Sequence, residues 1–153
     1  MMDLWLVRHG EAVPDRVDPT RPLSPEGARA VSAVAETLAG RMGPFDLVAS
    51  SGKKRALQTA AILGEAAGYP AEKVVETGAL SPNATPESFL DFLEGSAGAE
   101  CLMCVGHLPS IAAFASFFLS PGDPVSLVFG AGTVCRIRVA AMRRGGGELL
   151  LFV

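Results

Sequence analysis

The chain has 153 residues, of which 49% are hydrophobic and 19% charged, and its formal net charge is −3. These values predict one globular domain spanning residues 1–153 and exclude a disordered chain. The small net charge argues against a broad surface for nucleic acid or anionic membrane, and the longest apolar stretch, residues 111–119, is too short to cross a bilayer. Because no leader is recognisable at the N-terminus, we expect a cytoplasmic protein.

Short apolar runs alternate along the chain with longer segments at helical spacing, which predicts an α/β domain with a largely parallel sheet. Strands are expected at 3–8, 45–50, 73–77 and 100–106. Helices are expected from Ser24, a typical N-cap, to the stop at Gly43, and at 53–68, 85–95 and about 109–118. The tail holds three more apolar segments, at 125–129, 133–140 and 148–153, and the last two are expected to form a hairpin.

The three cysteines do not indicate a disulfide framework. Cys101 and Cys104 match the C-x-x-C pattern of redox and zinc sites, but they fall in a predicted buried strand. Residues three apart on a strand point to opposite faces, and no second cysteine pair completes a metal site. We therefore expect these two residues and Cys135 to be core thiols.

Polar side chains follow three of the predicted strands. Arg8 and His9 come directly after the first strand, Arg55 follows the second, and His107 follows the strand at 100–106. In parallel α/β sheets, ligands bind at the carboxyl ends of the strands. The sequence therefore predicts that both histidines of the chain and two arginines meet in one crevice.

Two histidines and two arginines without a nearby acidic cluster suit a phosphoryl group better than a metal ion, so we expect neither a metal nor a cofactor. Guanidinium groups offer paired donors to phosphate oxygens, and a neutral imidazole can attack phosphorus to form phosphohistidine. Arg8, Arg55 and His107 could neutralise the phosphoryl oxygens. Taken singly, each residue is also compatible with a solvated loop, a basic helix start or a core histidine, and it is their shared placement that favours a phosphate site.

Four segments resemble, in order, the motifs of the histidine phosphatase superfamily, the phosphoglycerate-mutase-like enzymes. They are LVRHGEA (6–12), RPLSPEGARA (21–30), ASSGKKRALQTAAIL (49–63) and LMCVGHLPSI (102–111). The resemblance implies a three-layer α/β/α sandwich with a mostly parallel central sheet, and a phosphatase that works through a phosphohistidine intermediate. It implies that His9 is the nucleophile and that Arg8, Arg55 and His107 complete the pocket. Arg21 would add positive charge at the rim, unless it is a solvated loop arginine.

The length and the segments TRPLS (20–24), GHLPSI (106–111) and LSPGDPVSLVF (119–129) are similar to the SixA-type phosphohistidine phosphatase branch. That resemblance implies a substrate that is phosphohistidine on a protein such as a histidine-phosphotransfer domain of a phosphorelay. A small-molecule phosphomonoesterase with the same pocket is the alternative, followed by a phosphate-binding module without turnover.

The chain departs from the superfamily pattern in three places. Gly52 stands where proline is common. Relatives that act on alkyl phosphate esters bring an acidic residue from the region after the third strand. In this chain that region contains no matching acid, and only Glu76 and Glu87 flank it. Glu11, close to His9, is equally well explained as a loop carboxylate near Arg8. A missing acid matters less for an imidazole leaving group. The segment 78–99 is also too short for a large lid, which favours an open site and a protein substrate.

Overall fold

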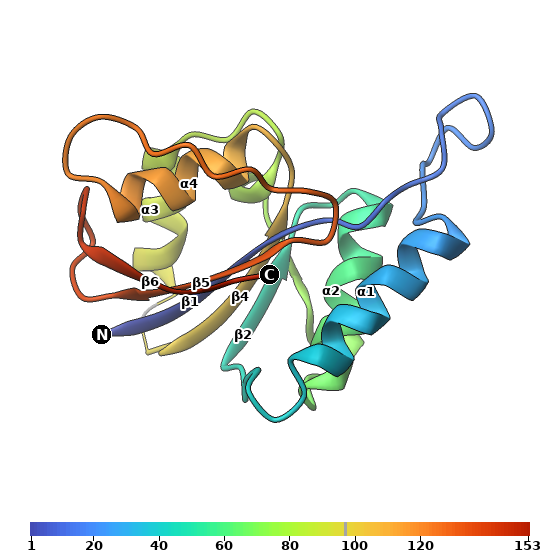
Figure 1. Ribbon diagram of the computed structural model, residues 1–153, viewed down its shortest axis with the longest axis horizontal. Helices are drawn as coiled ribbons and strands as arrows, with labels where there is room; N and C mark the ends of the chain where they lie inside the picture. Colours follow the sequence, from blue (N-terminus) through green and yellow to red (C-terminus); the bar gives the residue numbers. More distant parts are fainter. Residues whose placement is uncertain (97) are drawn as a thin grey trace.

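The computed structural model describes residues 1–96 and 98–153, and within these ranges the strands form one sheet in the order β3-β2-β4-β1-β5-β6 (Figure 1). The strands are β1 (Met2–Arg8), β2 (Leu47–Ser50), β3 (Val75–Glu76), β4 (Cys101–Gly106), β5 (Val134–Val139) and β6 (Gly147–Phe152). β1 to β4 run parallel, whereas β5 is antiparallel to β1 and β6 is antiparallel to β5. The carboxyl ends of β1, β2 and β4 therefore lie at the same edge of the sheet.

Helices cover both faces of this sheet. Helices α1 (Pro25–Thr37) and α2 (Lys54–Ala66) lie on one face, and α3 (Pro86–Gly95) and α4 (Ser110–Leu119) lie on the other (Figure 1). Two short 3-10 turns, η1 (Ala71–Lys73) and η2 (Gly78–Leu80), flank β3. The expected three-layer α/β/α architecture with a mostly parallel sheet is confirmed.

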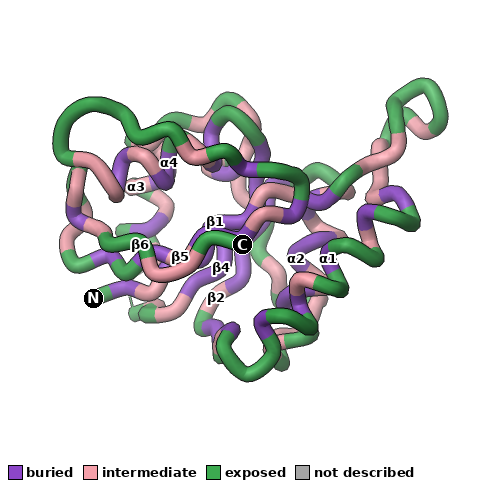
Figure 2. The backbone as a smooth tube through the Cα atoms, viewed as in Figure 1, coloured by how far each residue is buried: buried purple, intermediate pink, exposed green. Residues whose placement is uncertain are grey.

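The core consists of two layers that the central strands separate (Figure 2). Along β1, Leu4 and Leu6 pack toward α3 and α4, whereas Trp5 and Val7 pack toward α1 and α2, as the two-residue period of a strand requires. On β4, Cys104 belongs to the core layer that faces α3 and α4, and Cys101 packs against the layer that faces α1 and α2. The two thiols thus diverge as expected, and all three cysteines are free. Cys104 and Cys135 are buried core thiols, whereas Cys101, at the start of β4, is only half-buried.

Local signals at the helix ends work as predicted in most cases. The Ser24 side chain accepts from the Gly27 N–H at the start of α1, and Thr85 forms a capping box with Ser88 at the start of α3. The predicted end of α1 is wrong, because the helix stops at Thr37 and Gly40 adopts a φ of +80°, which breaks helical geometry. Leu38 is nevertheless fully buried, so the apolar spacing continues beyond the helix itself.

Two other segments differ from the expected elements. β3 contains only two residues, Val75 and Glu76, of the strand expected at 73–77, and it lies between η1, which ends at Lys73, and η2, which Thr77 caps. Of the three apolar tail segments, 125–129 forms no strand, and the other two pair as the antiparallel strands β5 and β6. Phe129 is instead buried with its ring edge-to-face against Phe152.

No helix in residues 1–96 and 98–153 is both long enough and apolar enough to span a membrane.

Candidate active site

Both histidines lie at the carboxyl edge of the sheet, each directly after a central strand. Arg8 and Gly106 are paired in register as the last residues of β1 and β4, so the residues that follow them, His9 and His107, come side by side. The His9 backbone N–H donates to the Gly106 carbonyl at 3.0 Å. The two imidazole rings are 4.8 Å apart between centroids and tilted by 57°. Parallel pairing of two strands therefore brings together histidines that are far apart in sequence.

His9 is held in one tautomer. Its Nδ1 lies 2.7 Å from the Gly10 carbonyl, and because a carbonyl only accepts, Nδ1 carries the proton. Burial lowers the pKa of His9 to about 4; the Gly10 carbonyl opposes this shift, and the charges of Arg55, Arg8 and Arg21 add to it. At neutral pH the imidazole is thus uncharged, with the lone pair on Nε2. The Arg55 Nε–H points to this atom from 3.4 Å.

His107 is almost completely buried, with 2% of its surface exposed. Its Nε2 lies 2.6 Å from the hydroxyl of Ser51, which is equally buried and also accepts from the Lys53 backbone N–H at 3.3 Å. Burial lowers the pKa of His107 to about 3, helped by nearby His9 and by the charges of Arg55, Lys53 and Arg8. The Ser51 hydroxyl is therefore hydrogen-bonded to one ring nitrogen of His107 and fixes the orientation of the imidazole. The other ring nitrogen, Nδ1, has no hydrogen-bond partner among the described residues.

The arginines that sequence reasoning selected lie around these rings. Arg8 donates through Nη1 to the Phe129 carbonyl at 2.9 Å, and its buried Nε has no partner among the described residues. Arg55 stands in the first turn of α2, where unpaired backbone N–H groups also favour an anion. Arg21 adopts a positive φ of 46° and donates from Nε to the Val13 carbonyl at 3.2 Å. Its charge depresses the pKa of both His9 and Arg55, although burial is the larger cause for each.

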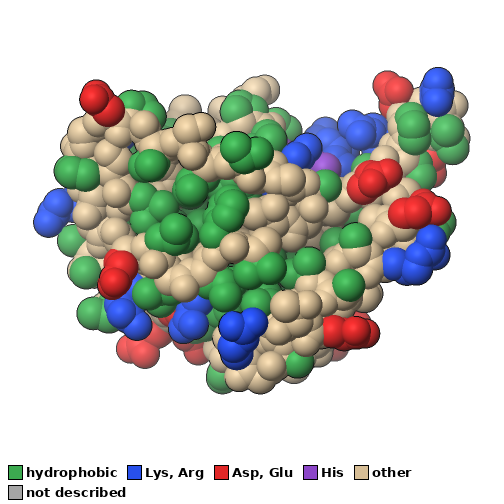
Figure 3. Space-filling view, viewed as in Figure 1, with side chains coloured by type: hydrophobic (Ala, Val, Ile, Leu, Met, Phe, Trp, Pro, Cys, Tyr) green, Lys and Arg blue, Asp and Glu red, His purple; other side chains and the backbone are tan. Residues whose placement is uncertain are grey.

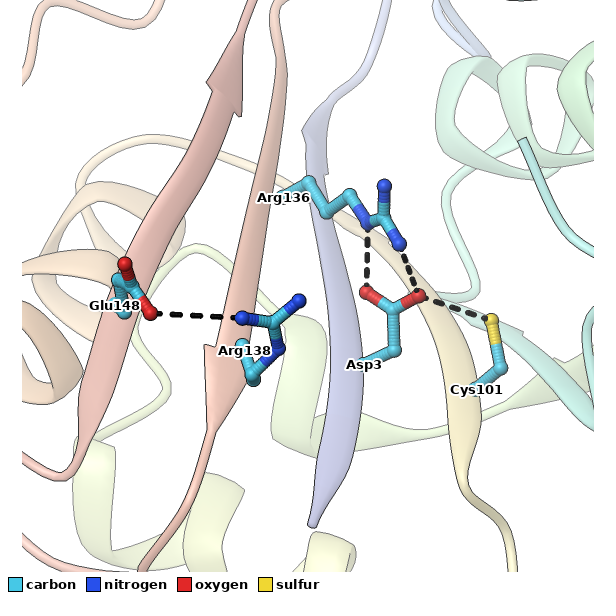
Figure 4. A network of polar contacts seen from close by, with 5 residues as sticks. All are labelled: Asp3, Cys101, Arg136, Arg138 and Glu148. Carbon is cyan, nitrogen blue, oxygen red and sulfur yellow. Dashed lines mark hydrogen bonds and ion pairs between the residues drawn. The ribbon is translucent and has the colours of Figure 1, made fainter. Parts of the chain in front are cut away.

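None of these three arginines forms an ion pair within the described parts of the chain. At the opposite end of β1 the pattern is different: Asp3 accepts two hydrogen bonds of 2.9 Å from Arg136 and one from the Cys101 thiol (Figure 4). Arg138 faces Glu148 at 3.6 Å. The amino end of the sheet is therefore neutralised, whereas Figure 3 shows Lys and Arg side chains gathered around a histidine with no carboxylate between them.

Several residues that sequence reasoning did not assign a role support this arrangement. The Thr59 hydroxyl accepts from the Gly10 N–H at 3.0 Å and donates to the Arg55 carbonyl at 2.8 Å, which links the loop after β1 to α2. The Gln58 side chain accepts from the Leu23 N–H at 2.7 Å. Both residues lie in the segment ASSGKKRALQTAAIL, so the motif marked their position, but only the fold reveals their partners.

A groove of about 460 Å³ adjoins the histidines on the β3 side. Its lining residues are Ser51, Gly52, Lys53, Glu76, Thr77, Gly78 and Ser81. Glu76, one of the acids considered from the sequence, places its Oε2 3.4 Å from the position that a Cβ on Gly52 would occupy. Glu87 is exposed on α3 and does not line this groove, and Glu11 is exposed in the loop after His9.

The arrangement suits the binding of a compact anion next to a neutral nucleophile. The Arg55 guanidinium and the His107 ring lie beside the Nε2 lone pair of His9, Arg55 stands in the first turn of its helix, and the charges of Arg8 and Arg21 also act on His9. The described residues contain no group of three or more His, Cys, Asp or Glu side chains with the spacing of a metal site.

Comparison with known proteins agrees with this geometry. Residues 4–77 match the histidine phosphatase superfamily (branch 1). A search of curated proteins finds no match. Among solved structures, the protein histidine phosphatase SixA complexed with tungstate is 22% identical, with a TM-score of 0.83 over 99% of this chain and 96% of that one.

Two further structures place the fold in a wider group. A protein assigned as a phosphohistidine phosphatase SixA from Nakamurella multipartitia is 28% identical, with a TM-score of 0.81 over 99% of this chain and 95% of its own. A phosphoserine phosphatase mutant from Entamoeba histolytica, in complex with phosphoserine, is 18% identical, with a TM-score of 0.67 over 99% and 96% of the two chains. The resemblance that the motifs indicate is therefore confirmed: the chain carries the histidine phosphatase signature over residues 4–77 and has, over its whole length, the fold of the SixA phosphohistidine phosphatases.

Proposed function

We propose that the chain is a single-domain, metal-independent phosphatase that dephosphorylates phosphohistidine on a protein, such as a histidine-phosphotransfer domain of a phosphorelay. The observation that carries the proposal is the neutral His9, whose Nε2 lone pair lies within 3.4 Å of the Arg55 guanidinium and beside the His107 ring.

In the first step, His9 Nε2 attacks phosphorus, and the bond from phosphorus to the leaving group breaks with its electron pair on the leaving atom. Arg8 and Arg55 neutralise the equatorial oxygens, His107 donates a hydrogen bond to one of them, and Arg21 adds positive charge at the rim. In the second step, water attacks phosphorus, and the same groups stabilise the transition state while His9 departs as neutral imidazole. The arginines supply the positive charge that a metal ion would otherwise provide.

The nature of the substrate is inferred from what surrounds the pocket. The segment 78–99 contributes only η2 and α3 in its described part, so the phosphoryl site stays open to a side chain presented by another protein. None of the three acids considered from the sequence has a contact that directs a proton at a leaving oxygen, and a departing imidazole needs such a proton less than an alkoxide does. The SixA phosphohistidine phosphatases that share the fold support the same substrate class.

A substrate panel tests the proposal: a phosphorylated histidine-phosphotransfer protein, phosphoramidate, 4-nitrophenyl phosphate, and sugar and nucleotide phosphates. We expect the P–N substrates and the aryl phosphate to be hydrolysed well, and the alkyl phosphates at least roughly a hundredfold more slowly, which is the weight of a missing general acid. Fast turnover of one alkyl phosphate and none of phosphohistidine would instead indicate a small-molecule phosphomonoesterase. Tight phosphate binding without any turnover would indicate a binding module.

A further inference from the structure

The groove beside the histidines is tied to the phosphoryl pocket by the pairing of β2 with β3. Glu76 is in register with Ser50, and the Thr77 N–H donates to the Ser50 carbonyl at 2.9 Å. The next residue, Ser51, lines the groove on one side and holds His107 on the other. A group bound in this groove therefore lies next to the atoms that would hold the phosphoryl oxygens.

Glu76 is a free carboxylate at this place. Within the described residues it makes neither an ion pair nor a side-chain hydrogen bond, and Lys53, the cation that lines the same groove, makes no ion pair. The carboxylate lies over residue 52: its Oε2 is 3.4 Å from the position that a Cβ on Gly52 would occupy, which is van der Waals distance. The groove thus combines an available carboxylate with space for a flat ring.

We propose that this groove receives the leaving group of the substrate, and that Glu76 accepts a hydrogen bond from the free ring nitrogen of a phosphorylated imidazole. The inference rests on the proposed function and specifies how the leaving group is recognised. A phosphohistidine ring has phosphorus on one nitrogen, and a proton on the other makes the ring a cation. An ionised carboxylate beside that N–H stabilises the cationic form.

The chemistry balances without a proton donor for the leaving atom. His9 Nε2 forms its bond to phosphorus, the substrate's P–N bond breaks, and the electron pair of that bond stays on the substrate nitrogen. Because the other ring nitrogen already carries a proton, the leaving group is neutral imidazole. Glu76 remains ionised throughout and acts by recognition. An alkyl phosphate has no N–H to offer, so the same residue would favour phosphohistidine over phosphate esters.

The test compares Glu76→Gln with Glu87→Gln, which makes the same chemical change on an exposed residue outside the groove. The probes are a peptide with one phosphohistidine and 4-nitrophenyl phosphate, and the readout is the ratio of their kcat/KM values. Glu76→Gln should lower this ratio roughly 10- to 100-fold, the weight of a charged hydrogen bond, and Glu87→Gln should leave it at the wild-type value.

Three results would overturn the inference. A Glu76→Gln ratio equal to that of the wild type would show that the carboxylate does not contact the ring. An equal loss on both substrates would show a general effect on the pocket. A selective loss on alkyl phosphates would make Glu76 a proton donor. If the wild-type enzyme fails to hydrolyse the phosphohistidine peptide while it hydrolyses the aryl phosphate, the proposed function itself fails, and the inference fails with it.

Discussion

Replacing Ser51 by alanine isolates the contact that orients His107. The substitution removes an oxygen that lies 2.6 Å from His107 Nε2 and 3.3 Å from the Lys53 N–H, in a region where Ser51 and His107 are each 2% exposed. A buried polar atom that loses its partner costs about 1–3 kcal/mol of unfolding free energy. For a chain of this length, each kcal/mol lowers Tm by about 2–4 °C.

The effect on activity should exceed the effect on folding. Without the Ser51 hydroxyl, the His107 ring loses the hydrogen bond that orients it, so the donor to the phosphoryl oxygen is displaced in part of the molecules. Complete loss of such a donor costs roughly 100- to 1000-fold in kcat, so Ser51→Ala should lower kcat for 4-nitrophenyl phosphate by roughly 10- to 100-fold. The drop should appear in kcat more than in KM, because the hydrogen bond strengthens in the transition state.

Ser50→Ala is the matched control for this experiment. Ser50 is fully buried, precedes Ser51 directly, and donates its side-chain hydrogen bond to the Ser51 carbonyl at 2.9 Å instead of to His107. It should lower Tm by a similar amount and leave kcat close to the wild-type value. Equal kcat losses in the two variants would refute the orienting role of Ser51, as would a wild-type kcat in Ser51→Ala when His107→Ala is strongly impaired.

Three further predictions concern the nucleophile, the metal and the titration of the histidines. His9→Ala should abolish turnover and keep the fold, since the His9 side chain makes only a few polar contacts in the site. Quenched wild-type enzyme should carry acid-labile phosphate on His9, and undiminished activity in the variant would disprove the mechanism. Activity should survive EDTA, and a loss that one added metal restores would disprove the role given to the arginines. Because His9 and His107 are the only histidines of the sequence, their proton NMR signals can be followed separately. Both imidazoles should titrate well below 6.5, near the lowered pKa values of about 4 for His9 and about 3 for His107. A ring that titrates near 6.5 would contradict the burial argument. The folded state then binds fewer protons than the unfolded state between those values and 6.5, so the free energy of unfolding should fall as the pH is lowered through this window.

The position of the site could be predicted from sequence because one rule controls it. Parallel strands end at one edge, so the residues that directly follow β1 and β4 are expected at that edge. The structure adds that β1 and β4 are neighbours with Arg8 in register with Gly106, which brings His9 and His107 side by side. The apolar alternation that defines the strands likewise predicted that Cys101 and Cys104 would face opposite layers.

The details that tune the site could not be predicted in this way. The partners of Arg8 and Gly10 are the Phe129 carbonyl and the Thr59 hydroxyl, residues 121 and 49 positions away in the chain. No local pattern encodes such contacts, because they depend on how loops pack after the sheet has formed. The groove at Glu76 has the same origin, since residues from the loop after β2 and from the segment 76–81 line it together.

Burial is the largest cause of the low pKa of His9, and the charges that lower it further are the ones assigned to hold the substrate. Arg55, Arg8 and Arg21 each add to the effect of burial in disfavouring a protonated imidazole, so the free site keeps its nucleophile without a separate general base. When a phosphoryl group binds, its negative charge offsets the positive charge of these guanidinium groups. His9 then attacks phosphorus, and its imidazole becomes positively charged. Loss of any one of these arginines should therefore weaken binding and also raise the pKa of the nucleophile. The paired Arg136 at the other end of β1, already neutralised by Asp3, has no such double role.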